Sequence, residues 1–68
     1  MDEKLTVIFH PNAEGTEWQR SAWSDRSEYT LGQGNTRGML YAAARFLDYD
    51  NVESIIIDDG TGSSVKIK

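Results

Sequence analysis

Residues 35–48, which read NTRGMLYAAARFLD, carry the clearest helical pattern of the chain, and this segment decides the fold. Asn35 or Thr36 can cap the amino end of a helix, and three consecutive alanines favour helix in its middle. At 100° per residue, one side collects five apolar side chains: Met39, Leu40, Ala43, Phe46 and Leu47. The spacing therefore predicts one amphipathic helix over about 35–48.

Strands are predicted on the amino-terminal side of this helix. Residues 5–9 are mostly β-branched or aromatic, which is typical of a strand. Residues 16–23 alternate in a way that suits a second strand, paired to the first as a hairpin; a short helix is the alternative, because apolar residues four apart also occur there. Residues 28–31 suit a short third strand, and residues 32–34 a flexible connector.

Two more strands are predicted after the helix. Residues 52–57 end in three consecutive isoleucines, and residues 63–68 alternate between apolar and polar side chains. The segment 58–62 between them contains Asp-Gly, which supplies the positive φ that tight hairpin turns need. We therefore expect a second hairpin at this end of the sequence.

This order, β-β-(β)-α-β-β, predicts an α+β fold: one helix packed on one face of a four- to five-stranded, mainly antiparallel sheet. With 68 residues, the chain has room for a single domain, which we place over residues 1–68. Two strand arrangements fit. In one, the terminal strands pair in parallel at the centre. In the other, which we favour because the isoleucine run suits a central strand, residues 55–57 pair with the first strand and the whole sheet is antiparallel.

Composition excludes several classes of protein. Hydrophobic residues make up 38% and charged residues 26%, which suits a globular domain, and there is no cysteine for a disulfide, a thiolate metal site or a thiol nucleophile. No apolar run approaches the roughly 20 residues that a membrane-spanning helix needs. The start, Met1-Asp2-Glu3-Lys4, is acidic and lacks the apolar region of a signal peptide. We expect a cytoplasmic protein with no membrane contact.

The residues offer no catalytic or metal-binding constellation. His10 is the only histidine, and nothing in the sequence pairs it with a nucleophile. Residues 48–53 begin like a calcium-binding loop, but Val52 stands where the third ligand belongs. We therefore expect no enzymatic activity, no metal and no cofactor.

The segment before the helix carries a weak signal for anion binding. Glycines that precede a helix amino end can expose backbone N–H groups to a phosphate. The residues concerned are Gly32, Gly34, Asn35, Thr36 and Arg37. Their spacing differs from the dinucleotide-binding and Walker patterns, and a loop that turns the chain onto the sheet is the simpler interpretation.

Residues 17–29 hold the strongest signal for binding. This segment contains five residues of the three types that most often supply interface energy, tryptophan, arginine and tyrosine: Trp18, Arg20, Trp23, Arg26 and Tyr29. If residues 18–23 form one strand, Trp18 and Trp23 point to opposite faces, so one of them stands outside the helix-covered core. Shielding of the far sheet face is the alternative role. Tyr41 and Arg45, four apart on the outer side of the helix, form a second candidate surface.

These observations favour a non-enzymatic, small acidic module that binds another protein, as a regulator or inhibitor of a larger one. Eleven acidic and seven basic residues give a net charge of −4, which would suit a basic, nucleic-acid-binding partner. Self-association as a homodimer would use the same surfaces. The alternative is a single-stranded nucleic-acid-binding module, with stacking aromatics and with Arg20, Arg26 and Arg37 on the backbone. The net charge makes nucleic acid the less favoured partner.

Overall fold

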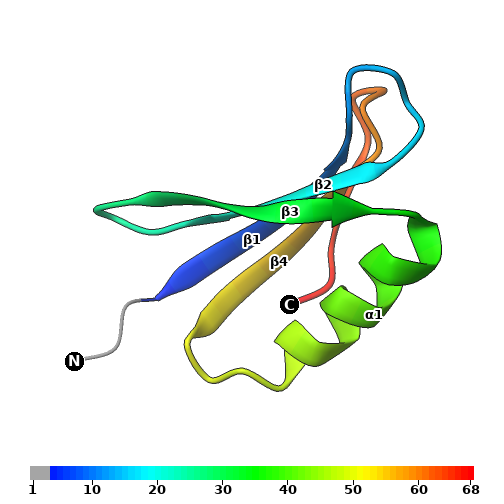
Figure 1. The fold of residues 1–68 in the computed structure, drawn as a ribbon. Helices are drawn as coiled ribbons and strands as arrows, with labels where there is room; N and C mark the ends of the chain where they lie inside the picture. Colours follow the sequence, from blue (N-terminus) through cyan, green and yellow to red (C-terminus); the bar gives the residue numbers. More distant parts are fainter. Residues whose placement is uncertain (1–3) are drawn as a thin grey trace.

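The computed structural model describes residues 4–68; residues 1–3, on which the expectation about a signal peptide partly rests, lie outside the described residues (Figure 1). Within residues 4–68, the fold consists of one helix and five strands. In chain order they are β1 (Leu5–Pro11), β2 (Trp18–Trp23), β3 (Glu28–Gly34), α1 (Thr36–Leu47), β4 (Val52–Asp58) and β5 (Ser64–Lys66). The helix packs on one face of the single sheet (Figure 1). The predicted α+β class and order of elements are confirmed.

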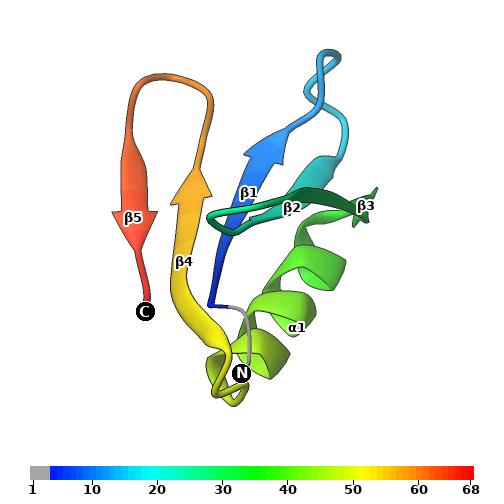
Figure 2. The same ribbon diagram turned by 90° about the vertical axis from the view of Figure 1, so that its left-hand side faces the viewer.

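The strands lie in the order β3-β2-β1-β4-β5, which is visible in Figure 2. Three of the neighbouring pairs are antiparallel, so the expectation of a mainly antiparallel sheet is confirmed. The favoured arrangement was right that β4 lies beside β1 but wrong about its direction: β1 and β4 run parallel, with Val7 opposite Ile55. The helix carries the chain across one face from β3 to β4, and such a crossover returns β4 in the same direction as β1.

Residues 32–34 are part of strand β3, so the expectation of a flexible connector there was wrong. Arg20 of β2 lies opposite Gly32, while the next residue, Ser21, lies opposite Thr30. Leu31 is therefore an extra residue in β3, which makes a β-bulge. Gly32 has a φ of 111°, a conformation that side-chain-bearing residues rarely adopt. The glycine thus allows the strand to continue past the bulge up to the helix.

The core lies between α1 and the central strands. Val7 and Phe9 of β1 and Ile55 of β4 are almost completely buried, and they face Met39, Ala42 and Ala43 of the helix. The buried side of the helix differs from the predicted apolar side: Leu40 and Leu47, which were expected to be buried, are 55% and 43% exposed. The core-facing side is formed by Met39, Ala42, Ala43 and Phe46, at helical spacings of three and four, so Leu40 and Leu47 lie at its edge.

Local hydrogen bonds hold the ends of these elements. Asn35 caps α1, and its Oδ1 accepts a hydrogen bond from the Gly38 amide at 2.8 Å. The β4–β5 turn forms as predicted: Asp58 Oδ1 accepts from the Gly60 amide at 2.9 Å, and Gly60 has a φ of 82°. Within residues 4–68, no helix has the length and apolar character needed to cross a lipid bilayer.

Candidate binding site

Strand β2 distributes the predicted binding residues over both faces of the sheet. Trp18, Arg20 and Ala22 lie opposite Pro11, Phe9 and Val7 of β1, so they share the helix-covered face. Gln19, Ser21 and Trp23 alternate with them and lie on the other face. The conditional expectation that the two tryptophans point to opposite faces is therefore confirmed.

Trp18 ties strand β2 to the start of the helix. Its indole Nε1 donates a hydrogen bond to Thr36 Oγ1 at 3.1 Å, and its ring packs partly buried against the core. A tryptophan held by its polar atom and by its ring has a structural role. Trp18 therefore contributes to the helix–sheet contact.

The remaining residues of the segment 17–29 lie apart from each other. Trp23 is 44% exposed on the sheet face that the helix leaves open, where it pairs with Thr6 and Glu28. Arg26 is exposed in the turn between β2 and β3, and Tyr29 lies half-exposed beside Ala22 on the helix side. The fold does not gather Trp23, Arg26 and Tyr29 into one site.

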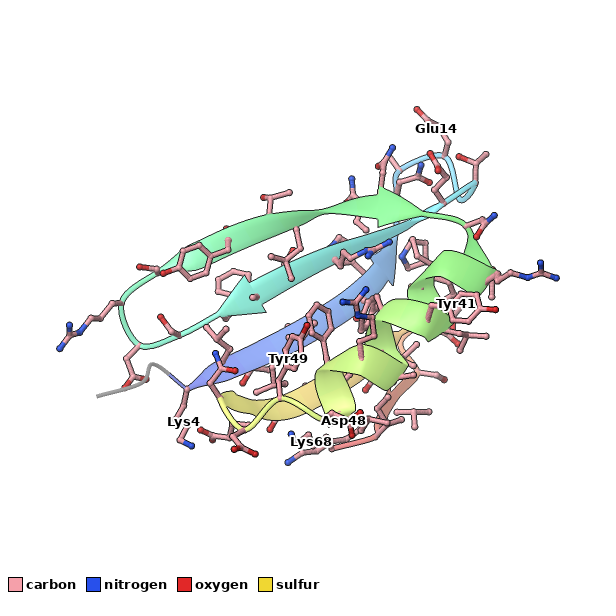
Figure 3. The ribbon with its side chains drawn as sticks, turned by 60° about the horizontal axis from the view of Figure 1, so that its bottom comes forward. Lys4, Glu14, Tyr41, Asp48, Tyr49 and Lys68 are labelled. Carbon is pink, nitrogen blue, oxygen red and sulfur yellow. The ribbon has the colours of Figure 1, made fainter. Side chains whose placement is uncertain are left out.

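Three other predicted binding residues do come together. A hollow of about 270 Å³ lies beside α1, and we call it the arginine hollow. It is lined by Arg20, Gly38, Tyr41, Ala42, Arg45, Phe46 and Tyr49. Tyr41 projects from the helix and Tyr49 from the segment that follows it (Figure 3). The hollow thus unites a strand residue, Arg20, with the Tyr41–Arg45 pair of the helix.

Gly34 makes room for the guanidinium group of Arg20, whereas Gly38 lies at an ordinary contact distance from it. A Cβ atom at Gly34 would lie 3.0 Å from Arg20 Nη2, and one at Gly38 would lie 3.9 Å from the same nitrogen. Arg20 Nε is buried and has no hydrogen-bond partner. A charged donor group thus lines the hollow, and its buried Nε–H has no acceptor.

Aromatic rings connect the wall of the hollow to the core. The rings of Phe46 and Tyr49 meet edge to face, with centroids 5.5 Å apart, and Phe46 in turn lies 6.3 Å from the ring of Phe9. Tyr41 is 67% exposed and stands free at the other side of the hollow. One tyrosine is thus fixed by packing, and the other can adjust to a bound group.

The arginine hollow is a positively charged region on a chain whose net charge is negative. The helix carries Arg37 and Arg45 and no acidic residue. Within residues 4–68, neither Arg20 nor Arg45 is held by an ion pair. The β1–β2 and β4–β5 turns lie at the same end of the sheet (Figures 1 and 2). Three acidic residues from this end line one surface hollow: Glu14, Asp58 and Asp59.

The acidic end of the sheet has its own local bonding. Thr61 Oγ1 donates a hydrogen bond to Asp59 Oδ1 at 2.6 Å, and the Thr61 amide donates to the same oxygen at 2.9 Å. These two bonds lower the pKa of Asp59 below its ordinary value. Among residues 4–68, no group of three or more histidine or acidic side chains is placed to hold a metal ion.

The residues predicted to bind an anion before the helix have structural contacts. Gly32 and Gly34 belong to β3, Asn35 caps the helix, and Thr36 accepts the Trp18 hydrogen bond. Arg37 is exposed beside Tyr41. Anion binding by this segment stays a prediction, although the Asn35 side chain already occupies one of the helix N–H groups.

Phe46, Tyr49 and Gly38 were not predicted as site residues, whereas Gly34 was predicted only as part of the anion-binding segment. Tyr49 continues the four-residue spacing of Tyr41 and Arg45, so extending that spacing past the predicted helix end would have found it. No protein-family model, curated protein or solved structure matches this chain. The geometry of the arginine hollow is therefore the basis for a functional interpretation.

Proposed function

We propose that this chain is a non-enzymatic module that binds another protein through the arginine hollow. One observation carries the proposal: two arginines, Arg20 and Arg45, and two tyrosines, Tyr41 and Tyr49, line the same hollow. Arginine and tyrosine are among the residue types that supply most of the energy at protein interfaces, and they do so from pockets near the interface centre.

The size and charge of the hollow support a side chain of a partner as its occupant. Its volume of about 270 Å³ is smaller than the roughly 300–1,000 Å³ of pockets that enclose whole small molecules. Its two arginines favour an acidic group on the partner, while the acidic turns at the end of the sheet favour a basic surface nearby. Such a partner would have mixed charge. A role as regulator or inhibitor, in the cytoplasm, is part of this proposal.

Single-stranded nucleic acid is the second candidate. Arg37, Tyr41 and Arg45 follow each other at intervals of four along the exposed side of the helix, and alternating cations and rings suit a nucleic-acid strand. This candidate has less support, because the indole of Trp18 is already engaged with Thr36 and packs partly against the core. The net charge of −4 also opposes binding to phosphates.

The test is capture of partners from an extract of the host by the tagged full chain, with and without nuclease. Three forms are compared: the natural chain, Arg45→Ala in the hollow, and Arg26→Ala in the β2–β3 turn as the matched control. We expect the natural chain to retain a protein in stoichiometric amount after nuclease treatment. Arg26→Ala should bind this protein equally well, whereas Arg45→Ala should bind it at least about tenfold more weakly.

Two results would contradict the proposal. If the natural chain and Arg45→Ala retain the same partner equally well, the hollow is not the contact surface. If everything captured is lost after nuclease treatment, single-stranded nucleic acid becomes the leading candidate. Circular dichroism of both variants checks that they are folded.

A further inference from the structure

We propose that the arginine hollow is a site for a phosphate monoester, which a partner would present on a side chain. This inference rests on the proposed function, because it assigns a ligand chemistry to the same hollow. It goes further in naming a dianionic group, and it can be tested without knowing the partner.

Arg20 has an unpaired hydrogen-bond donor. The guanidinium group has five N–H donors in a planar fork, and here the buried Nε has no acceptor. Leaving a buried donor unpaired costs free energy, and a bound oxygen atom that accepts from it recovers that cost. Phosphate oxygens match the spacing of the guanidinium fork and form charge-assisted hydrogen bonds with it. Arg20 lines the hollow, so its guanidinium group is available to a phosphate bound there, and its Nε has no acceptor in the unliganded protein.

Two positively charged side chains line the hollow. Arg20 reaches the hollow from the sheet and Arg45 from the helix, so two positive charges border one space. A phosphate monoester carries a charge of about −1.5 to −2 at neutral pH, whereas a carboxylate carries −1. Two arginines with no acidic partner among residues 4–68 are therefore better balanced by a phosphate ester than by a single carboxylate.

Part of the lining of the hollow is apolar. Ala42, Phe46 and the two tyrosines offer carbon surface beside the charged groups. Such surface contributes nothing to binding of a free inorganic phosphate but contacts the carbon portion of an ester. We therefore expect the hollow to prefer an aryl phosphate to inorganic phosphate.

The experiment is a titration of the isotope-labelled full chain, followed by amide chemical shifts. Three probes are compared: phenyl phosphate, inorganic phosphate and benzoate, which is aromatic but has a single charge. We expect saturable shifts at Gly38 and Tyr49 with phenyl phosphate, and binding about tenfold or more weaker for each of the other two probes. Arg45→Met should weaken phenyl phosphate binding about tenfold or more, whereas Arg26→Met, the matched control in the β2–β3 turn, should leave it unchanged.

Each other outcome overturns the inference. Equal binding of benzoate means that the site takes a single negative charge, and equal binding of inorganic phosphate means that it takes the free ion. Phenyl phosphate that binds Arg45→Met as well as the natural chain, or that does not bind at all, excludes the hollow as an ester site.

The two proposals can fail separately. Capture of a partner that depends on Arg45, without any phenyl phosphate binding, keeps the proposed function and removes this inference. Phenyl phosphate binding that depends on Arg45, together with partner capture that does not, keeps the phosphate site and removes the proposed function of the hollow.

Discussion

Replacing Arg20 with methionine should stabilise the free protein while it removes binding in the arginine hollow. Methionine has an unbranched side chain without a hydrogen-bond donor. The substitution therefore removes the cost of burying the unpaired Nε–H of Arg20. An unsatisfied buried donor costs about 1–3 kcal/mol. Because part of the guanidinium group borders the open hollow, the lower end of this range applies, and we expect the free energy of unfolding to rise by about 1 kcal/mol. In a domain of this size, that corresponds to about 4–8 °C in Tm.

The assay is urea denaturation followed by far-ultraviolet circular dichroism, for the natural chain, Arg20→Met and the control Arg26→Met. The slope of the free energy against urea should be the same for all three, so that a shift in the midpoint measures stability. Arg26 is exposed, and its replacement should change stability by less than about 0.5 kcal/mol. A loss of about 1 kcal/mol or more in Arg20→Met would refute the reasoning, because the guanidinium group would then stabilise the unliganded fold.

Three further predictions concern the fold. Trp18→Phe and Thr36→Val each remove one partner of a hydrogen bond of 3.1 Å, and a double-mutant cycle in urea should give a coupling of about 0.5–1 kcal/mol; strictly additive effects would contradict that bond. Ile55 is fully buried, so Ile55→Ala should lower the free energy of unfolding by about 2–5 kcal/mol, out of the roughly 3–10 kcal/mol expected for a chain of this length. An unchanged thermal melt would disprove the central packing of Ile55. The lowered pKa of Asp59 means that its ionised form stabilises the fold above its ordinary pKa and that this contribution is lost as the pH falls through the lowered pKa. Thr61→Val should therefore move the pKa back up in an NMR titration of the carboxyl group, and an unchanged pKa would exclude Thr61 as the main cause.

Residue patterns within short segments predicted most of the fold. The helix at 35–48 and the first strand at 5–9 each carry their own periodicity, so both could be located to within a few residues. The direction of β4 could not be predicted in this way. An isoleucine run at 55–57 indicates burial, but both parallel and antiparallel pairing with β1 satisfy it, and the helical crossover decides between them.

The candidate site was predictable in its residue types but not in its assembly. The sequence predicts Tyr41 and Arg45 as a pair on one side of the helix and Arg20 as a binding residue of a different segment. Their meeting depends on the register that places Arg20 on the helix side of β2, and on the rotation of the helix about its axis. The role of Gly34 depends on where the guanidinium group of Arg20 lies, which no local pattern records.

The parallel pairing of β1 with β4 also determines how this chain is expected to fold. The hairpins β1–β2 and β4–β5 each close a short loop, whereas the central pair joins segments far apart in the sequence. Closing a long loop loses more chain entropy before any contact compensates for it. We therefore expect the two hairpins to form early and their docking to limit the rate, so that folding is slower than in a helical bundle of equal length. Weakening the contact between Val7 and Ile55 should accordingly slow refolding more than it accelerates unfolding.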